Sequence, residues 1–161
     1  MLAVTSSLAV LDCLRQQMKT LEKAVMKRLK HSPAYEQFLT VEGSGAMLAQ
    51  TTVLETRQIG CFSTVCNSAS YCRCVTCTQI SNGKWKGQGN VTHGHPYLAW
   101  AYMEAARFAI RFSHSVQRFY QRKQAKSHRM VARKAVANQL ARACYDIIRD
   151  LMPCVVHKAF G

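Results

Sequence analysis

The first regular hydrophobic pattern lies near the N-terminus. Apolar residues recur there at alternating intervals of three and four, separated mainly by Lys, Arg, Gln and Glu: Leu11, Leu14, Met18, Leu21 and Val25. This is the a/d spacing of a heptad. It predicts either an amphipathic helix on a globular core or a coiled-coil arm, which Pro33 ends. We therefore expect residues 1–33 to form a coiled-coil-like helical arm and residues 34–161 to form a second domain.

Two short helical patterns follow, with a glycine-containing turn between them. They cover residues 34–39 and 46–54, and Gly43-Ser44-Gly45 separates them. This order is typical of a helix-hairpin-helix, in which Gly43 and Gly45 would allow a tight turn and expose backbone amides to a phosphate. A tight turn between two packed helices, with no ligand, fits the same pattern.

The rear of the chain has two longer apolar stripes of helical period. The first comprises Leu98, Ala101, Tyr102, Ala105, Phe108, Ala109, Phe112, Val116 and Phe119. The second, within residues 129–151, comprises Ala132, Val136, Leu140, Ala143, Ile147 and Leu151. The short connection between them, residues 121–128, predicts an antiparallel helical hairpin.

Residues 60–96 have no such period. They are rich in Ser, Thr, Cys, Asn and Gly, and they predict a long irregular, glycine-rich loop segment. Residues 71–75 within it could be a short strand or a helix end. The fold class that follows is mainly α.

Charge adds a functional class to this picture. The 161 residues include 22 Lys and Arg against 8 Asp and Glu, a formal net charge of +14. Such an excess indicates a polyanionic partner, either nucleic acid or an anionic membrane surface. The hydrophobic fraction of 48% excludes a wholly disordered chain. No stretch has the length and apolarity of a membrane span, and no secretory signal is evident, so a cytoplasmic location is expected.

The positive charge is concentrated in the predicted helical hairpin. Its cations, with no acidic residue among them, are Arg107, Arg111, Arg118, Arg122, Lys123, Lys126, Arg129, Arg133 and Lys134. A charged run is often only a solvated face. Here the cations have no counter-charge, and phosphate contact is the economical explanation. This surface is the predicted DNA- or RNA-binding site.

Cysteine and histidine residues raise the question of a metal. Cys72, Cys74 and Cys77 precede His93 and His95, and thiolates with imidazoles can bind zinc. The spacing lacks the paired C-x-x-C of structural zinc sites, so we expect reduced thiols and no metal. A zinc-dependent binding module is the alternative. The acidic residues are far apart along the chain, which argues against metal-assisted phosphoryl transfer by this chain alone.

A serine in the glycine-rich segment is the candidate nucleophile. Ser81 is followed by Lys84 and Lys86, and lysines beside a serine can bind a phosphate and stabilise the charge of an attacked phosphodiester. On spacing alone, a solvated polar loop is the better interpretation.

Several blocks resemble a known family. They are residues 69–74, 80–84, 86–90, 97–101, 119–123, 135–137, 140–145 and 158–161, within a similarity that covers nearly all of residues 10–161. The chain is similar there to bacterial insertion-sequence transposases of the IS-one-ten family, IS-eleven-eleven subgroup, whose members are RNA-guided recombinases.

The resemblance implies a two-part enzyme. In the family, a RuvC-like domain with four acidic residues is joined by a coiled coil to a C-terminal domain with a helix-hairpin-helix-like region and a catalytic serine that attacks DNA. This chain resembles the coiled coil and the C-terminal domain, and the serine of its Ser-Asn-Gly-Lys block is Ser81. Magnesium is expected only with the RuvC-like domain. The expected partners are DNA, a guide RNA, and a second copy or a full-length transposase through the arm, with no membrane.

The chain departs from the family pattern in three blocks. The usual Gly-Ile-Gly is Gly43-Ser44-Gly45, the usual Glu-x-Gly-Asp-Ile is residues 55–59, and the usual Asn-Gly-Asn is His93-Gly94-His95. With the RuvC-like part unmatched, these departures indicate a truncated copy. The leading interpretation is a DNA-binding transposase domain in the bacterial cytoplasm, at the nucleoid, that is not catalytically competent by itself. The alternative is a non-catalytic nucleic-acid-binding protein that pairs or competes with a full-length transposase.

Overall fold

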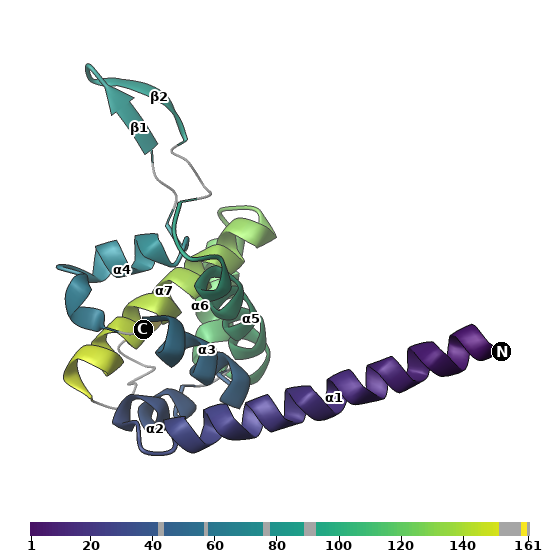
Figure 1. Ribbon diagram of the computed structural model, residues 1–161. Helices are drawn as coiled ribbons and strands as arrows, with labels where there is room; N and C mark the ends of the chain where they lie inside the picture. The colour runs from purple at the N-terminus through teal and green to yellow at the C-terminus, as the bar shows by residue number, and fades with distance from the viewer. Residues whose placement is uncertain (42–43, 57, 76–77, 89–92, 152–158, 161) are drawn as a thin grey trace. The chain divides into compact units, whose positions relative to one another are not determined.

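A computed structural model describes residues 1–41, 44–56, 58–75, 78–88, 93–151 and 159–160. The chain is mainly α, as predicted, with one two-stranded sheet among the described residues. The elements, labelled in Figure 1, are α1 (Leu2–Leu29), α2 (Pro33–Leu39), α3 (Ala46–Thr56), the 3₁₀ helix η1 (Ile59–Cys61), α4 (Val65–Tyr71), β1 (Thr78–Ser81), β2 (Lys84–Gln88), α5 (Pro96–Phe112), α6 (His114–Gln124) and α7 (Arg129–Asp150). The chain divides into two compact units, Met1–Ser32 and Pro33–Gly161.

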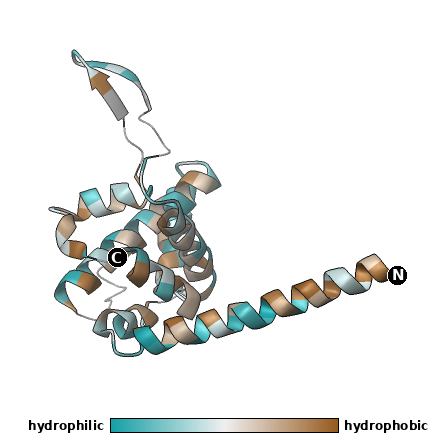
Figure 2. Cartoon of the chain, viewed as in Figure 1, coloured by the Kyte–Doolittle hydropathy of each residue, from teal (hydrophilic) through white to brown (hydrophobic). Residues whose placement is uncertain are grey.

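The first unit is the long helix α1. Hydrophobic and hydrophilic residues alternate along it (Figure 2). The predicted apolar edge is on its surface, where Leu11, Leu14, Met18 and Leu21 are all exposed. Lys27 and Arg28 occupy the last turn, where cations stabilise the negative end of the helix dipole. The helix ends at Leu29, and Pro33 begins α2, a position that suits a residue without a backbone N–H.

The core of the second unit is built around α7. This helix packs against α4, α5 and α6, and α3 packs against α5 and α2. Small residues at these contacts let the helices approach closely; the buried alanines include Ala101, Ala105, Ala106, Ala109, Ala132, Ala137 and Ala141. The largest fully buried side chains are Phe38, Leu98, Val116, Val136 and Cys144. No helix within the described ranges is long and apolar enough to cross a membrane.

The single helix predicted over the first rear stripe is wrong, because it is two helices. Ser113 has φ −105° and ψ 119°, which is extended geometry, so α5 ends at Phe112 and α6 begins at His114. Phe108 and Phe112, two members of that stripe, are exposed and stack on each other with ring centroids 6.5 Å apart. On the second stripe, Leu151 is exposed because it follows the end of α7 in the left-handed conformation.

The irregular segment predicted for residues 60–96 is also wrong in part. It contains α4 and the antiparallel strands β1 and β2. Thr64 starts α4 because its side chain accepts a hydrogen bond from the Asn67 amide. Tyr71 is the last residue of α4, so residues 71–75 form a helix end rather than a strand.

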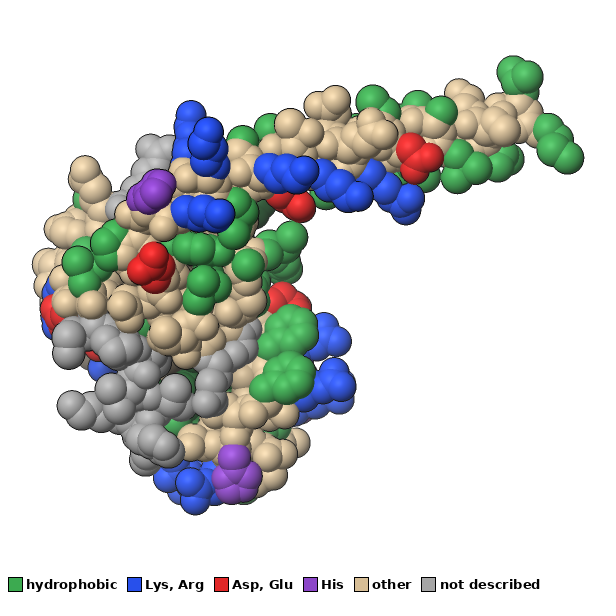
Figure 3. All heavy atoms as spheres, turned by 90° about the horizontal axis from the view of Figure 1, so that it is seen from below, with side chains coloured by type: hydrophobic (Ala, Val, Ile, Leu, Met, Phe, Trp, Pro, Cys, Tyr) green, Lys and Arg blue, Asp and Glu red, His purple; other side chains and the backbone are tan. Residues whose placement is uncertain are grey.

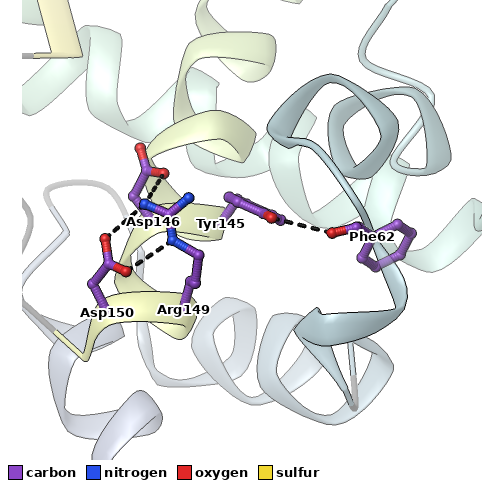
Figure 4. A network of polar contacts seen from close by, with 5 residues as sticks. All are labelled: Phe62, Tyr145, Asp146, Arg149 and Asp150. Atoms are coloured by element: carbon purple, nitrogen blue, oxygen red, sulfur yellow. Dashed lines mark hydrogen bonds and ion pairs between the residues drawn. The ribbon is translucent and has the colours of Figure 1, made fainter.

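The last turns of α7 carry a polar network (Figure 4). The Tyr145 hydroxyl donates to the carbonyl oxygen of Phe62 at 3.1 Å, which joins α7 to the segment before α4. Arg149 donates two hydrogen bonds to the Asp150 carboxylate, at 2.8 and 2.9 Å, and also pairs with Asp146. The bonds from Arg149 hold the pKa of Asp150 below its ordinary value.

Candidate nucleic-acid interface

The β1–β2 hairpin carries the candidate nucleophile at its tip. The two-residue turn between the strands is Asn82-Gly83, with φ values of 52° and 70°. Both values are left-handed, as a type I′ hairpin turn requires, and Asn-Gly is its preferred sequence. Ser81 and Lys84 flank this turn as directly opposite residues. Opposite side chains share one face of a two-stranded sheet, so the Ser81 hydroxyl and the Lys84 ammonium lie on the same face.

A shift of register distinguishes the next residues of the hairpin. Ile80 lies opposite Trp85 and Gln79 lies opposite Gly87, which leaves Lys86 as the additional residue of a bulge. Gly87 has φ 132°, a backbone conformation that side chains rarely allow. Because faces alternate along a strand, Ile80 and Trp85 lie on the face opposite to Ser81.

The hairpin contains no histidine or carboxylate beside the serine. Residues 78–88 include no His, Asp or Glu that could accept the Ser81 proton. The structure brings Ser81 together with Lys84, whereas no hydrogen bond joins it to a described residue of the basic helices. The site as described can present a hydroxyl and a cation to a phosphate.

The two ends of the segment that carries the hairpin are fastened together. Arg73, just after α4, donates from Nε and Nη2 to the Gly94 carbonyl oxygen at 3.1 and 2.9 Å. The His95 amide donates to the Tyr71 carbonyl oxygen at 2.8 Å. Gly94 has φ 103°, and a Cβ there would collide with that same Tyr71 carbonyl. We call Tyr71, Arg73, Gly94 and His95 the hairpin clamp.

His95 also joins the clamp to α3 and α5. Its Nε2 lies 3.0 Å from Oε2 of Glu55, and its Nδ1 accepts a hydrogen bond from the Leu98 amide in the first turn of α5. Its ring packs between those of Tyr71 and Tyr97, each with a centroid 5.8 Å away. A histidine considered as a zinc ligand is therefore a helix cap and a partner of the Glu55 carboxylate.

The basic residues predicted to bind nucleic acid lie on three helices and one connection. Arg107 and Arg111 are on α5, Arg118, Arg122 and Lys123 are on α6, Lys126 is in the connection, and Arg129, Arg133 and Lys134 are on α7. All are exposed except Arg133 and Lys134, which are half-buried. Within the described part of residues 57–145, the one acidic residue is Glu104, which pairs with Arg107 at 3.6 Å. Most of this charge is therefore uncompensated.

Some of these cations also have structural contacts. Arg122 donates to the carbonyl oxygen of Phe160 at 3.2 Å and, like Lys123, lies over the Phe119 ring. Lys134 lies close enough to Cys74 to influence its ionisation, and Asn138 donates to the Cys74 carbonyl. The first turns of α7 therefore contact the chain beside the hairpin clamp.

A groove that the sequence analysis missed lies between the α2–α3 connection and α5. Its volume is about 660 Å³, and it is lined by Leu39, Thr40, Val41, Ser44, Gly45, Met47, Leu48, Trp100, Glu104, Phe108 and Phe112. In the view of Figure 3, exposed hydrophobic side chains have Lys and Arg side chains beside them. Of the two turn glycines, Gly45 lines the groove and Gly43 lies outside the described residues. Phe108 and Phe112 belong to the predicted apolar stripe because their spacing on α5 continues that of its buried members.

The thiols are distributed between surface and core. Cys13, Cys61 and Cys66 are exposed, whereas Cys72, Cys74 and Cys144 are buried, and all six are free. Burial raises the pKa of Cys72 and of Cys74 to about 12. Where the structure describes the chain, no three His, Cys, Asp or Glu residues form a group that could hold a metal ion. Cys77 lies outside the described residues.

Comparison with known protein families finds a match for this chain. A family model described as "Transposase IS116/IS110/IS902 family" matches residues 35–121. The match covers more than half of the chain and includes the hairpin, its clamp, the groove and the first basic residues of α5 and α6. No curated protein sequence matches the chain significantly.

Proposed function

Since the chain belongs to the IS116/IS110/IS902 family of transposases, we propose that it is a DNA-binding domain that acts in insertion-sequence transposition, with Ser81 as the nucleophile. The observation that carries this proposal is the exposed, largely uncompensated positive charge of α5, α6 and the connection to α7. Neutralising phosphates with such residues releases counterions from DNA, which drives binding without requiring base contacts.

The arrangement of Ser81 and Lys84 supports the assignment of the nucleophile. In the proposed step, Ser81 Oγ attacks a phosphodiester phosphorus, the bond from phosphorus to one sugar oxygen breaks, and the Ser81 proton ends on that oxygen. Lys84, on the same face of the hairpin, would stabilise the added negative charge on phosphorus. Since the reaction exchanges one phosphate ester for another, it needs no oxidant or energy source.

The family resemblance implies magnesium bound by a RuvC-like domain. The described residues of this chain do not fit such a site, because they gather no group of acidic residues. We assign no step to the metal. We expect activation of the Ser81 hydroxyl to require the separate acidic domain that the resemblance implies, so that the isolated chain binds DNA in the bacterial cytoplasm without cleaving it.

The second candidate function is a non-catalytic nucleic-acid-binding protein. The lack of a proton acceptor within residues 78–88 favours it. Both functions use the same partners. DNA and a guide RNA would bind the basic surface, and the exposed apolar edge of α1 would pair with a second copy or a full-length transposase as a coiled coil.

Salt-dependent binding tests the shared part of both functions. If six or so phosphates are contacted, the logarithm of the affinity should fall with the logarithm of salt concentration at a slope of about −5. The triple variant Arg111→Ala, Arg118→Ala, Lys126→Ala removes three exposed cations and should make the slope shallower by about 3.

The matched control removes the same charge from α1, through Lys19→Ala, Lys23→Ala and Lys27→Ala, and should leave the slope nearly unchanged. Equal losses in the two triple variants would show that net charge alone drives binding and would refute the proposed surface.

A further inference from the structure

The hairpin has an apolar face that the attack by Ser81 does not use. Ile80 and Trp85 are directly opposite each other across the strands, and they are 68% and 69% exposed. Among the described residues, no ring contact involves Trp85. Burying a tryptophan side chain is strongly favourable, so an indole with this much exposed surface indicates a site that a partner covers.

The backbone of the hairpin fixes where this indole can go. The type I′ turn at Asn82-Gly83 and the bulge at Lys86 determine the register on both sides of Trp85. Trp85 therefore lies one residue from Lys84 in sequence and on the opposite face of the same ribbon from Ser81. A molecule that reaches the nucleophile is within reach of the indole as well.

The charge around Trp85 favours nucleic acid as the molecule that covers it. Lys84 and Lys86 are its sequence neighbours, and residues 78–88 include no acidic side chain. Aromatic rings beside backbone-binding cations are the usual means of holding unpaired nucleotides, because every base offers a flat face for stacking. In an intact duplex those faces are covered by neighbouring base pairs. A two-stranded ribbon also fits the major groove of a duplex, but an indole there would meet base edges and not base faces.

We propose that Trp85, supported by Ile80, stacks on an unpaired base of the DNA strand whose phosphodiester faces Ser81. This inference rests on the proposed function. The two faces of the hairpin then have different roles. Lys84 binds the phosphate beside the Ser81 hydroxyl, and the Trp85 indole holds the adjacent nucleotide out of the DNA double helix. Trp85 is a positioning residue for strand attack, and the hairpin prefers melted or single-stranded DNA over duplex.

Tryptophan fluorescence reads this contact directly. The chain has 2 tryptophans, so Trp100→Phe leaves Trp85 as the sole emitter in the full-length chain. Single-stranded DNA should quench its emission, and a duplex of the same sequence should quench it much less. Quenching by anionic vesicles or by single-stranded RNA, without quenching by single-stranded DNA, would overturn the assignment to DNA.

Affinity measurements separate this inference from the function on which it rests. Trp85→Ala should weaken binding to single-stranded DNA about tenfold and leave duplex binding unchanged, whereas Trp85→Phe should retain most of the affinity. Phe112→Ala, an equally exposed aromatic residue on α5, is the matched control and should not alter the preference. Tight binding that Trp85→Ala does not change would refute the stacking role alone. Failure of the parent chain to bind any DNA would refute the proposed function as well.

Discussion

Nε2 of His95 lies 3.0 Å from Oε2 of Glu55, and the same imidazole caps the first turn of α5 through Nδ1. One side chain thereby holds the end of α3, the start of α5 and the clamp below the hairpin. The two residues are 40 positions apart in sequence, and nothing in the sequence indicates that they meet. Their contact fixes one end of the segment that carries the hairpin to α3.

The first prediction concerns this contact. His95→Ala should lower the free energy of unfolding by about 1–2 kcal/mol, because it removes the cap and the contact with Glu55 together. His95→Asn should lower it by about half as much, since asparagine is a good helix cap but does not reach Glu55. Urea unfolding of both variants provides the measurement. Equal losses in the two variants would show that the cap contributes nothing.

The second prediction concerns the hydrogen bond between Tyr145 and Phe62. Tyr145 is buried, and its hydroxyl donates to the Phe62 carbonyl at 3.1 Å. Tyr145→Phe keeps the packing and leaves the carbonyl without this donor, which should cost about 1 kcal/mol of stability. Tyr97→Phe, at an exposed tyrosine of α5, is the control and should be neutral. An unchanged melting temperature for Tyr145→Phe would contradict the assigned bond.

The third prediction concerns the buried thiols. Burial raises the pKa of Cys72 and of Cys74 from 9.0 to about 12. In the unfolded chain these thiols lose protons above about pH 9, whereas in the fold they keep them. Stability should therefore be complete below about pH 9 and should fall as the pH rises toward 12, by at most about 1.4 kcal/mol per pH unit for each thiol.

Comparison with the double variant Cys72→Ala, Cys74→Ala isolates this effect from other titrations. Urea unfolding at about pH 8 and about pH 10.5 should show a smaller alkaline loss in the variant than in the parent. The same alkaline loss in both proteins would mean that these thiols ionise equally in the folded and unfolded chains.

The fourth prediction concerns the apolar edge of α1. Leu14 and Met18 are exposed on it, and two such edges can bury each other as a coiled coil. Leu14→Glu with Met18→Glu should convert an associated chain to a monomer in analytical ultracentrifugation. Gln16→Glu with Thr20→Glu adds the same charge to exposed residues off the edge and should leave the association unchanged. A parent chain that is monomeric at all concentrations would contradict the predicted pairing.

The sequence predicted those parts of the fold that depend on local pattern. The apolar residues on the edge of α1 and on the stripe of α7 recur with helical period, and both helices lie where that period predicts them. The break at Ser113 was missed because apolar residues continue across it without interruption. The hairpin was missed although Asn82-Gly83 is a strong turn signal, since its strands are short and do not alternate between hydrophobic and polar residues.

The candidate site was predicted only as far as residue type allows. The cations of α5, α6 and α7 were recognisable because charge without counter-charge is visible in sequence. The roles of His95, Arg73 and Gly94 were not, because each depends on a partner from a distant part of the chain. The apolar face of the hairpin was equally hidden, since only the register shows that Ile80 and Trp85 lie opposite each other.

The covalent state of Ser81 tests the central claim most directly. The chain would be mixed with a full-length relative whose own serine is mutated, together with its guide RNA and both DNA partners, and resolved on a denaturing gel. We predict a covalent adduct between DNA and this chain that Ser81→Ala abolishes and Ser127→Ala, at a half-buried hydroxyl between α6 and α7, leaves intact. An adduct that survives Ser81→Ala, or the lack of any adduct with this chain in the complete mixture, would contradict the account.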